Sequence, residues 1–174
     1  MSTRSSVRLR ALEPEDWKLL YQWENDMKNW PVSQTLAPYS KYVLQEFIKS
    51  SNNNVFVDKQ LRLMVEKAST DETIGVLDFF EMDALHKRVG IGILIGESFR
   101  HCGYALETLQ LAKTLAFETW NVHQIFCHVM HSNQKSLKLF QQAGFTIVGS
   151  KKDWIATNEG YEDVYFLQCL NAQN

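Results

Sequence analysis

A short polar turn separates an apolar, strand-like run from an amphipathic helix in the segment SFRHCGYALETL, residues 98–109. A helix that begins near Gly103 or Tyr104 leaves its first backbone amides without intrahelical partners, and these amides point into one small space. Such a helix start favours a phosphate or a similar anion. Gly103 has no side chain to keep an anion from the backbone, and Arg100 adds a positive charge. An ordinary strand-to-helix turn fits the segment equally well.

The elements that position this turn are predicted from periodicity and turn signals. Apolar alternation predicts strands, and apolar spacing of three and four residues predicts helices. The expected order is β α α β β β α β α β β. The predicted strands cover residues 7–12, 61–67, 73–82, 88–96 and 123–130 and two final runs that start near Phe145 and Tyr161; the predicted helices cover 14–25, 41–50, a stretch from Tyr104 and 133–144, with a loop at 29–40.

Composition restricts the class of protein. At 174 residues, the chain is expected to form one α/β domain over residues 1–174. A net charge of −2 with scattered Lys and Arg gives no basic footprint for nucleic acid. No run resembles a signal peptide or a membrane span, so we expect a cytoplasmic protein without a membrane partner. The three cysteines have unrelated spacings and are expected to be reduced thiols.

Two further patterns contain residue types that are typical of binding sites. The run GIGILIG, residues 90–96, lies inside a strand and lacks the spacing of a dinucleotide-binding turn. His123, Cys127, His128 and His131 crowd one strand, but His128 points opposite to Cys127 and the spacing fits no zinc signature. The sequence therefore predicts no metal site.

Two motifs resemble those of a known family. RHCGYA is similar to the pyrophosphate loop of the GNAT superfamily of acyl-CoA-dependent N-acetyltransferases, and NQKSLKLFQQAGF is similar to its second signature. The motifs occur in the order of the family, about 30 residues apart, and the resemblance runs from VRLRALEPEDW to GYEDVYFLQCL. It is strongest to the branch of the bacterial spermidine N-acetyltransferases and the ribosomal-protein-alanine N-acetyltransferases.

The resemblance implies an α/β (α+β) fold and a co-substrate. The fold would be a mixed twisted sheet of about six to seven strands, with a V-shaped splay between two central parallel strands and about four flanking helices. Acetyl-CoA would bind with its pantetheine arm in the splay and its pyrophosphate on the amides of residues 100–105. The implied cofactor residues are Ile93, Leu94, Ile95, Arg100, His101, Cys102, Gly103, Tyr104, Ala105, Asn133 and Ser136.

Direct acetyl transfer needs a neutral amine, and a carboxylate can remove the ammonium proton directly or through water. The candidates are Asp78 and Glu81 in GVLDFFEM. Strand alternation places Asp78 and Phe80 on one face and Phe79 and Glu81 on the other, so only one of the two carboxylates should face the cleft. We predict that this is Asp78, which matches in position an acidic residue of the spermidine-type relatives; a solvated strand position is the alternative.

The chain departs from the family at the proton donor for the leaving thiolate. Many relatives carry a tyrosine where Phe140 stands, and phenylalanine donates no proton. Solvent, Tyr104 or Tyr165 would replace it, or the thiolate would leave unassisted. Phe140, together with Gly90 where relatives often carry a carboxylate, leaves a second hypothesis open: a catalytically weak acyl-CoA-binding regulatory module.

Acidic and aromatic residues of the first helix and its exit would attract a cationic acceptor by Coulomb and cation–π forces. The predicted acceptor-binding residues are Glu24, Trp30 and His86. Glu15 and Asp16 belong to the same acidic group, but they also fit as helix-capping residues. The expected reaction is direct attack of a primary amine in a ternary complex. A polyamine such as spermidine, a protein or peptide N-terminus and an aminoglycoside-like or other small-molecule amine remain open as acceptors, and the resemblance also implies a homo-oligomer.

Overall fold

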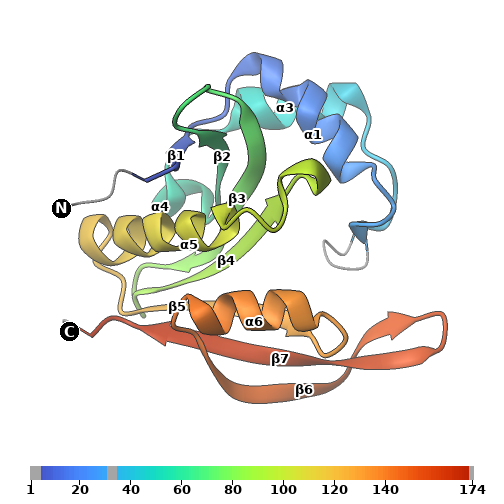
Figure 1. Ribbon diagram of the computed structural model, residues 1–174, viewed down its shortest axis with the longest axis vertical. Helices are drawn as coiled ribbons and strands as arrows, with labels where there is room; N and C mark the ends of the chain where they lie inside the picture. Colours follow the sequence, from blue (N-terminus) through green and yellow to red (C-terminus); the bar gives the residue numbers. More distant parts are fainter. Residues whose placement is uncertain (1–4, 31–34, 173–174) are drawn as a thin grey trace.

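One mixed β-sheet runs through the centre of the molecule (Figure 1). The computed structural model describes residues 5–30 and 35–172. Within these residues the sheet has seven strands in the order β1-β2-β3-β4-β5-β7-β6, and only β4 and β5 pair in parallel. The strands are β1 (Val7–Arg10), β2 (Leu61–Lys67), β3 (Thr73–Asp83), β4 (Arg88–Ile95), β5 (Gln124–Met130), β6 (Thr146–Thr157) and β7 (Gly160–Leu170). The mixed sheet and its parallel central pair confirm the expected fold class.

Helices cover both faces of this sheet. Those of the described residues are α1 (Trp17–Glu24), α3 (Lys41–Ser50), α4 (Val55–Asp58), α5 (Tyr104–Thr114) and α6 (Gln134–Gln142). The short α4 was not predicted, because its four residues are too few to show a helical period. A π-helical turn, Leu115–Thr119, follows α5. Residues 31–34 of the predicted loop 29–40 lie outside the described residues.

Alternate residues of β2, β3 and β4 pack into two separate cores. On one face, residues such as Leu63, Leu77 and Ile91 pack with Leu109 of α5 and Leu137 of α6. On the other face, the core is smaller and is formed by Leu20 of α1, Leu44 of α3, Met64 and Val76. Figure 1 shows α1 and α3 together at one end of the molecule, while α5 and α6 lie along the middle. The α1/α3 helices thus cover only the β1–β4 half of their face.

The central strands β4 and β5 separate soon after they begin. Their parallel pairing covers only three residue pairs and ends at Gly90 and Phe126. Beyond this point β4 stays paired with β3 as far as Ile95, whereas β5 stays paired with β7 as far as Met130. The two halves of the sheet therefore diverge, which is the V-shaped splay that the resemblance implied.

Strand β3 is interrupted by a β-bulge near its end. Its register with β4 shifts between Phe80 and Asp83, and Glu81 has a positive φ of 50°. A bulge adds a residue to one strand and redirects the side chains around it. Simple alternation along β3 therefore fails at Glu81.

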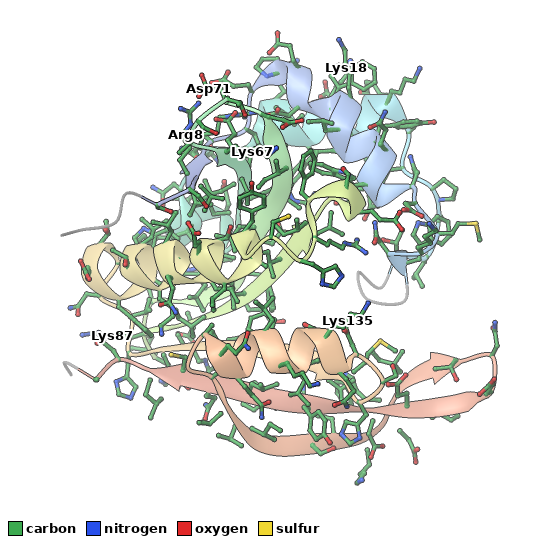
Figure 2. The ribbon with its side chains drawn as sticks, viewed as in Figure 1. Arg8, Lys18, Lys67, Asp71, Lys87 and Lys135 are labelled. Carbon is green, nitrogen blue, oxygen red and sulfur yellow. The ribbon has the colours of Figure 1, made fainter. Side chains whose placement is uncertain are left out.

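Strand β1 is tied to the sheet by a network of ion pairs. Buried Glu66 accepts hydrogen bonds from Arg8 at 2.8 Å and from Arg10 at 2.5 Å. Arg10 also binds both oxygens of Asp16, and Asp16 accepts a hydrogen bond from the amide of Glu13, forming a capping box. Figure 2 shows Arg8 beside Asp71, whose carboxylate it contacts at 2.7 Å. Asp16 therefore has the capping role that the sequence left open.

The second helix signature has the caps that its sequence predicted. The side chain of Asn133 accepts a hydrogen bond from the amide of Ser136 at 3.1 Å. Gly144 follows the last residues of α6 with a φ of 92°, a conformation that glycine adopts readily. Both ends of α6 are thus fixed by local sequence.

Candidate functional site

A cleft of about 660 Å³ lies where α1, α3 and the sheet meet the splay. We call it the central cleft. Its walls come from α1, α3, β2, β3, β4, β5 and α6, so the divergence of β4 and β5 opens directly into it. Its polar side chains are those of Glu24, Asn29, Thr35, Tyr39, Gln60, Arg62, Asp78, Glu81, His128 and Ser136.

One arginine holds two carboxylates of the central cleft. Arg62 and Asp78 face each other across β2 and β3. The guanidinium of Arg62 donates to both Asp78 oxygens, at 2.6 and 2.9 Å, and to Glu24 of α1 at 2.5 Å. Burial alone would lower the pKa of Arg62, but Asp78 and Glu24 raise it above its ordinary value. The guanidinium therefore stays charged and fixes both carboxylates.

Glu81 corrects the expectation from strand alternation. Asp78 and Glu81 both line the central cleft, although the period of a regular strand would place them on opposite faces. The bulge at Glu81 is the physical reason. The described residues offer Glu81 no hydrogen bond or ion pair within bonding distance, so its exposed carboxylate is available to a ligand.

His128 faces Asp78 across a gap in the same row of the sheet. Asp78 pairs with Gly92, and His128 pairs with Phe166. The last β4–β5 pair is Gly90 with Phe126, and Gly92 and His128 each follow it by two residues. Because side chains two residues apart on a strand share a face, Gly92, His128 and Asp78 lie on the same face of the sheet. Gly92 places no side chain between them, and a Cβ there would meet only the Phe80 ring, at 3.9 Å.

From sequence alone, His128 is considered only as a member of a possible zinc site, and its spacing excludes that site. Its signal was the alternation of β5, which places Phe126 and His128 on the face opposite to buried Cys127. Among the described residues, no group of three or more His, Cys, Asp and Glu side chains is arranged to hold a metal ion. Nor does any helix of the described chain have the length and apolar character to cross a membrane.

The backbone of β4 presents unpaired polar groups to the splay. The amide of Gly96 donates to Ile74 at 2.8 Å, which shows that even-numbered β4 residues bond to β3. Ile93 and Ile95 consequently direct their amides and carbonyls toward the side that β5 has left. Arg100 Nε donates to the Ile95 carbonyl at 2.9 Å. The side chain of Leu94 packs against the α1/α3 core instead.

The turn before α5 has a row of free amides. The Arg100 amide donates to the Glu97 carbonyl at 3.4 Å, whereas within the described residues the amides of 101–105 have no backbone or side-chain acceptor. His101 and Gly103 have positive φ values of 64° and 83°. A Cβ on Gly103 would meet nothing within 4 Å, so conformation rather than crowding requires glycine here. Five consecutive amides and a nearby guanidinium fit a diphosphate.

Residues of α6 form the opposite wall of the splay. Ser136 and Phe140 both line the central cleft, and Phe140 is 3% exposed with its ring against Phe145. The two tyrosines considered as proton donors lie elsewhere: Tyr104 packs on the core at the start of α5, and Tyr165 stacks on His131 at 3.7 Å. Tyr39 is the only tyrosine among the described residues that line the cleft.

The predicted acceptor residues are not brought together. Glu24 lines the central cleft, whereas Trp30 is not part of the cleft wall and donates from its indole to the Glu24 carbonyl at 2.9 Å. His86 is exposed in the β3–β4 turn, where its amide donates to Asp83 at 2.9 Å. Its imidazole is not part of the cleft wall, because the bulged end of β3 carries the turn away from it.

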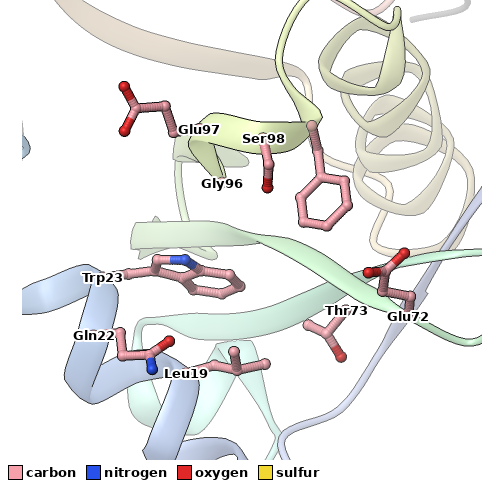
Figure 3. A pocket seen from close by; sticks show the side chains of 9 residues that line it. Leu19, Gln22, Trp23, Glu72, Thr73, Gly96, Glu97 and Ser98 are labelled. Carbon is pink, nitrogen blue, oxygen red and sulfur yellow. The ribbon is translucent and has the colours of Figure 1, made fainter.

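Two further cavities border the sheet. A cavity of about 970 Å³, which we call the ribbon cavity, lies over β5 and β7 and shares Glu81 and His128 with the central cleft. A cavity of about 730 Å³ lies between α1 and residues 96–99, where Figure 3 shows Leu19 and Trp23 facing Gly96 and Ser98. None of the free amides of residues 101–105 lines this third cavity.

Comparison with known proteins identifies one family and close structural relatives. Residues 6–146 match the model of the acetyltransferase (GNAT) domain. The chain is 27% identical over 169 residues to spermidine N(1)-acetyltransferase of Vibrio cholerae, covering 97% of this chain and 95% of the relative.

Solved structures of the Vibrio cholerae protein are similar throughout. Its complex with CoA and spermine superposes with a TM-score of 0.85 at 26% identity, covering 96% of each chain. A dodecameric structure of the same enzyme in an intermediate state has a TM-score of 0.77 at 23% identity and covers 98% of this chain and 96% of that one.

Proposed function

Because this chain belongs to the GNAT acetyltransferase family, we propose that it transfers the acetyl group of acetyl-CoA to a primary amine held by the carboxylates of the central cleft. The observation that carries this proposal is the shared guanidinium of Arg62. It fixes Asp78 and Glu24 at the cleft wall, and Glu81 adds a third carboxylate. Three carboxylates against one guanidinium leave the cleft negative, which attracts a cationic amine.

The residues that would hold acetyl-CoA are those of the splay and of the turn before α5. The free amides of residues 101–105 fit its diphosphate, with Arg100 close by. Ile93 and the amide of Ile95 offer unpaired backbone groups to the pantetheine arm, while the Ile95 carbonyl accepts from Arg100. Asn133 and Ser136 lie at the start of α6 on the other side. When bound, acetyl-CoA supplies the activated acetyl thioester.

The amine would reach the thioester from the side of Asp78. Asp78 already uses both oxygens on Arg62, so its role is to bind and orient the ammonium. A backbone amide near Ile95 would polarise the thioester carbonyl. At the leaving-group end Phe140 has no proton to give, and the thiolate takes its proton from solvent.

The acceptor class is a cationic primary amine, with a polyamine such as spermidine as the first candidate. The relative that binds CoA and spermine supports this choice, together with the negative cleft. A peptide N-terminus is the second candidate, since it presents the same ammonium group. The dodecameric relative supports self-association of this chain, which light scattering on the purified protein would measure.

The test is amine-dependent release of CoA. The purified chain is incubated with acetyl-CoA and with spermidine, spermine, a small monoamine or a peptide with a free N-terminus, and the free thiol is followed. Release that depends on the amine and yields the acetylated amine supports the proposal. Tight CoA binding without amine-dependent release in any of these mixtures would instead favour the acyl-CoA-binding module.

A further inference from the structure

His128 stands at the boundary between the central cleft and the ribbon cavity. It lines both, and it is half-buried on the sheet face that carries Asp78. The gap over Gly92 separates the imidazole from the Asp78 carboxylate. An amine bound by Asp78 would therefore have His128 on its other side.

An ammonium group already contacts this imidazole. Lys151 of β6 places its Nζ 2.9 Å from His128 Nε2. Since an ammonium only donates, Nε2 accepts, and the ring proton of a neutral imidazole then lies on Nδ1. The same Nζ lies 4.4 Å from the Trp154 ring centroid and 5.9 Å from that of Phe166. These groups form a receptor for an alkylammonium, the chemical group that an acceptor amine presents.

The surroundings of His128 keep its imidazole neutral. Burial lowers its pKa, Lys151 from β6 lowers it further, and Glu81 from β3 acts in the opposite direction. Beyond Glu81, the charged side chains that line the ribbon cavity are Lys59, Asp83, Arg88 and Lys151. From β7 only the uncharged Phe166 faces the ring, at a centroid distance of 5.2 Å. A neutral imidazole has a lone pair ready to accept a proton.

The carboxylates of the cleft are less suited to this step. Arg62 binds both oxygens of Asp78 and one oxygen of Glu24, and this positive charge makes both carboxylates weaker bases. Glu81 has free oxygens, but a carboxylate is ordinarily a weaker base than an imidazole by about two pKa units. Proton transfer is most efficient when the base titrates near the working pH.

We propose that His128 Nε2 accepts the proton of the acceptor ammonium when the amine replaces Lys151 as the hydrogen-bond partner of this nitrogen. The inference rests on the proposed function. The acceptor displaces Lys151, its N–H proton moves to Nε2, and its nitrogen attacks the thioester carbonyl carbon. The N–C bond forms as the C–S bond breaks. The second proton of the new amide nitrogen and the proton on the imidazolium both pass to solvent, and the departing thiolate takes one proton from solvent.

The test compares His128→Gln with His131→Gln in the full chain. His131 stacks on Tyr165 and bonds Ser150, away from the cleft, and serves as the matched control. With acetyl-CoA and spermidine, H128Q is expected to lose about 100-fold in kcat and the acidic limb of its pH profile, while CoA affinity is unchanged. H131Q is expected to behave as the wild-type chain.

Lys151→Met tests whether His128 takes part in catalysis, because a histidine with only a structural role would leave the pH profile of kcat/KM unchanged in this variant. Removing the competing ammonium is expected to lower KM for the amine about threefold to tenfold. It also removes a charge that lowers the His128 pKa, so the acidic limb of kcat/KM shifts to higher pH. If the acidic limb of kcat/KM in K151M stays at the same pH as in the wild-type chain, the inference is overturned.

The tautomer of His128 is measured without turnover. Nitrogen-15 NMR of the full chain, with H128Q identifying the signal among the five histidines, is expected to show a neutral Nδ1–H ring whose Nε2 signal responds to spermidine. An imidazole that carries its proton on Nε2, or wild-type turnover by H128Q, would overturn this inference but leave the proposed function standing. No amine-dependent CoA release from the wild-type chain overturns the proposed function as well.

Discussion

The guanidinium of Arg62 binds both carboxylate oxygens of Asp78, through Nε at 2.6 Å and Nη2 at 2.9 Å. Its remaining nitrogen, Nη1, reaches Glu24 on α1, so one side chain of β2 joins a helix to the neighbouring strand. Two carboxylates separated by 54 positions in the chain are thereby fixed on one wall of the central cleft. Bidentate contacts of this kind set geometry as well as charge.

Glu24→Gln is expected to weaken acceptor binding. The change removes one negative charge beside the cleft and keeps the side chain's size, so KM for spermidine should rise about tenfold, equivalent to about 1.4 kcal/mol. CoA affinity should not change. Steady-state kinetics and calorimetry measure the two quantities, with Glu46→Gln on the exposed face of α3 as the control. Equal KM values in E24Q and E46Q would argue against the cleft as the acceptor site.

Gly92→Val is expected to block the gap between Asp78 and His128. A Cβ at this position would meet only Phe80, at 3.9 Å, so the backbone accepts a side chain here, and the methyl groups of valine would enter the space of the amine. We expect kcat/KM for the amine to fall about 100-fold while CoA still binds. Gly149→Ala, at a β6 glycine with open space around it, is the control. A fully active G92V would place the amine elsewhere.

Gly103→Val is expected to abolish CoA binding. Gly103 has a φ of 83°, where a β-branched residue is strained by about 1–3 kcal/mol. The turn would relieve this strain by changing its backbone conformation, which displaces its free amides. Calorimetry with CoA should show at least a tenfold loss of affinity. Circular dichroism checks that the sheet persists. If G103V binds CoA as the wild type does, the diphosphate does not lie on this turn.

Glu66→Gln is expected to destabilise the fold and flatten its acid dependence. Burial would raise the pKa of Glu66, but hydrogen bonds from Arg10 and Arg8 lower it below its ordinary value. A carboxyl with a lowered folded pKa stabilises above its unfolded pKa and loses that contribution as pH falls through its folded pKa. E66Q should lose about 2 kcal/mol at pH 7 and less at low pH.

Urea unfolding at pH 7 and near pH 3 measures this difference. The control is Glu72→Gln, whose pair with Lys67 lies at the surface, where solvent screens it, and should contribute little. An equal loss at both pH values would show that the charge of Glu66 is not what stabilises β1.

Much of the architecture was predictable because its signals are local. Alternating and helical apolar periods identified the seven strands and the longer helices, and Asn133 and Gly144 bound α6 as predicted. The polar turn before Tyr104 likewise identified the row of free amides. The four-residue α4 was missed because it is shorter than a helical period can reveal.

The candidate site was only partly predictable. Asp78, Glu81 and Glu24 were expected and line the cleft, but the expectation that alternation would exclude Glu81 was wrong. His86 was placed near the cleft by sequence proximity, and the bulged end of β3 carries it away. Arg62 and His128 were not singled out as functional residues, since each gains its neighbours only by strand pairing.

The sequence by itself determined most of the elements, the caps of α6 and the turn with free amides before α5, because neighbouring residues set these backbone conformations. Only the tertiary structure decided that Arg62 joins Asp78 to Glu24 and that His128 faces Asp78 over Gly92. These relationships depend on strand register and on the separation of β4 from β5 after Gly90. Register is set by the packing of two whole sheet faces, so no short segment of the chain contains it.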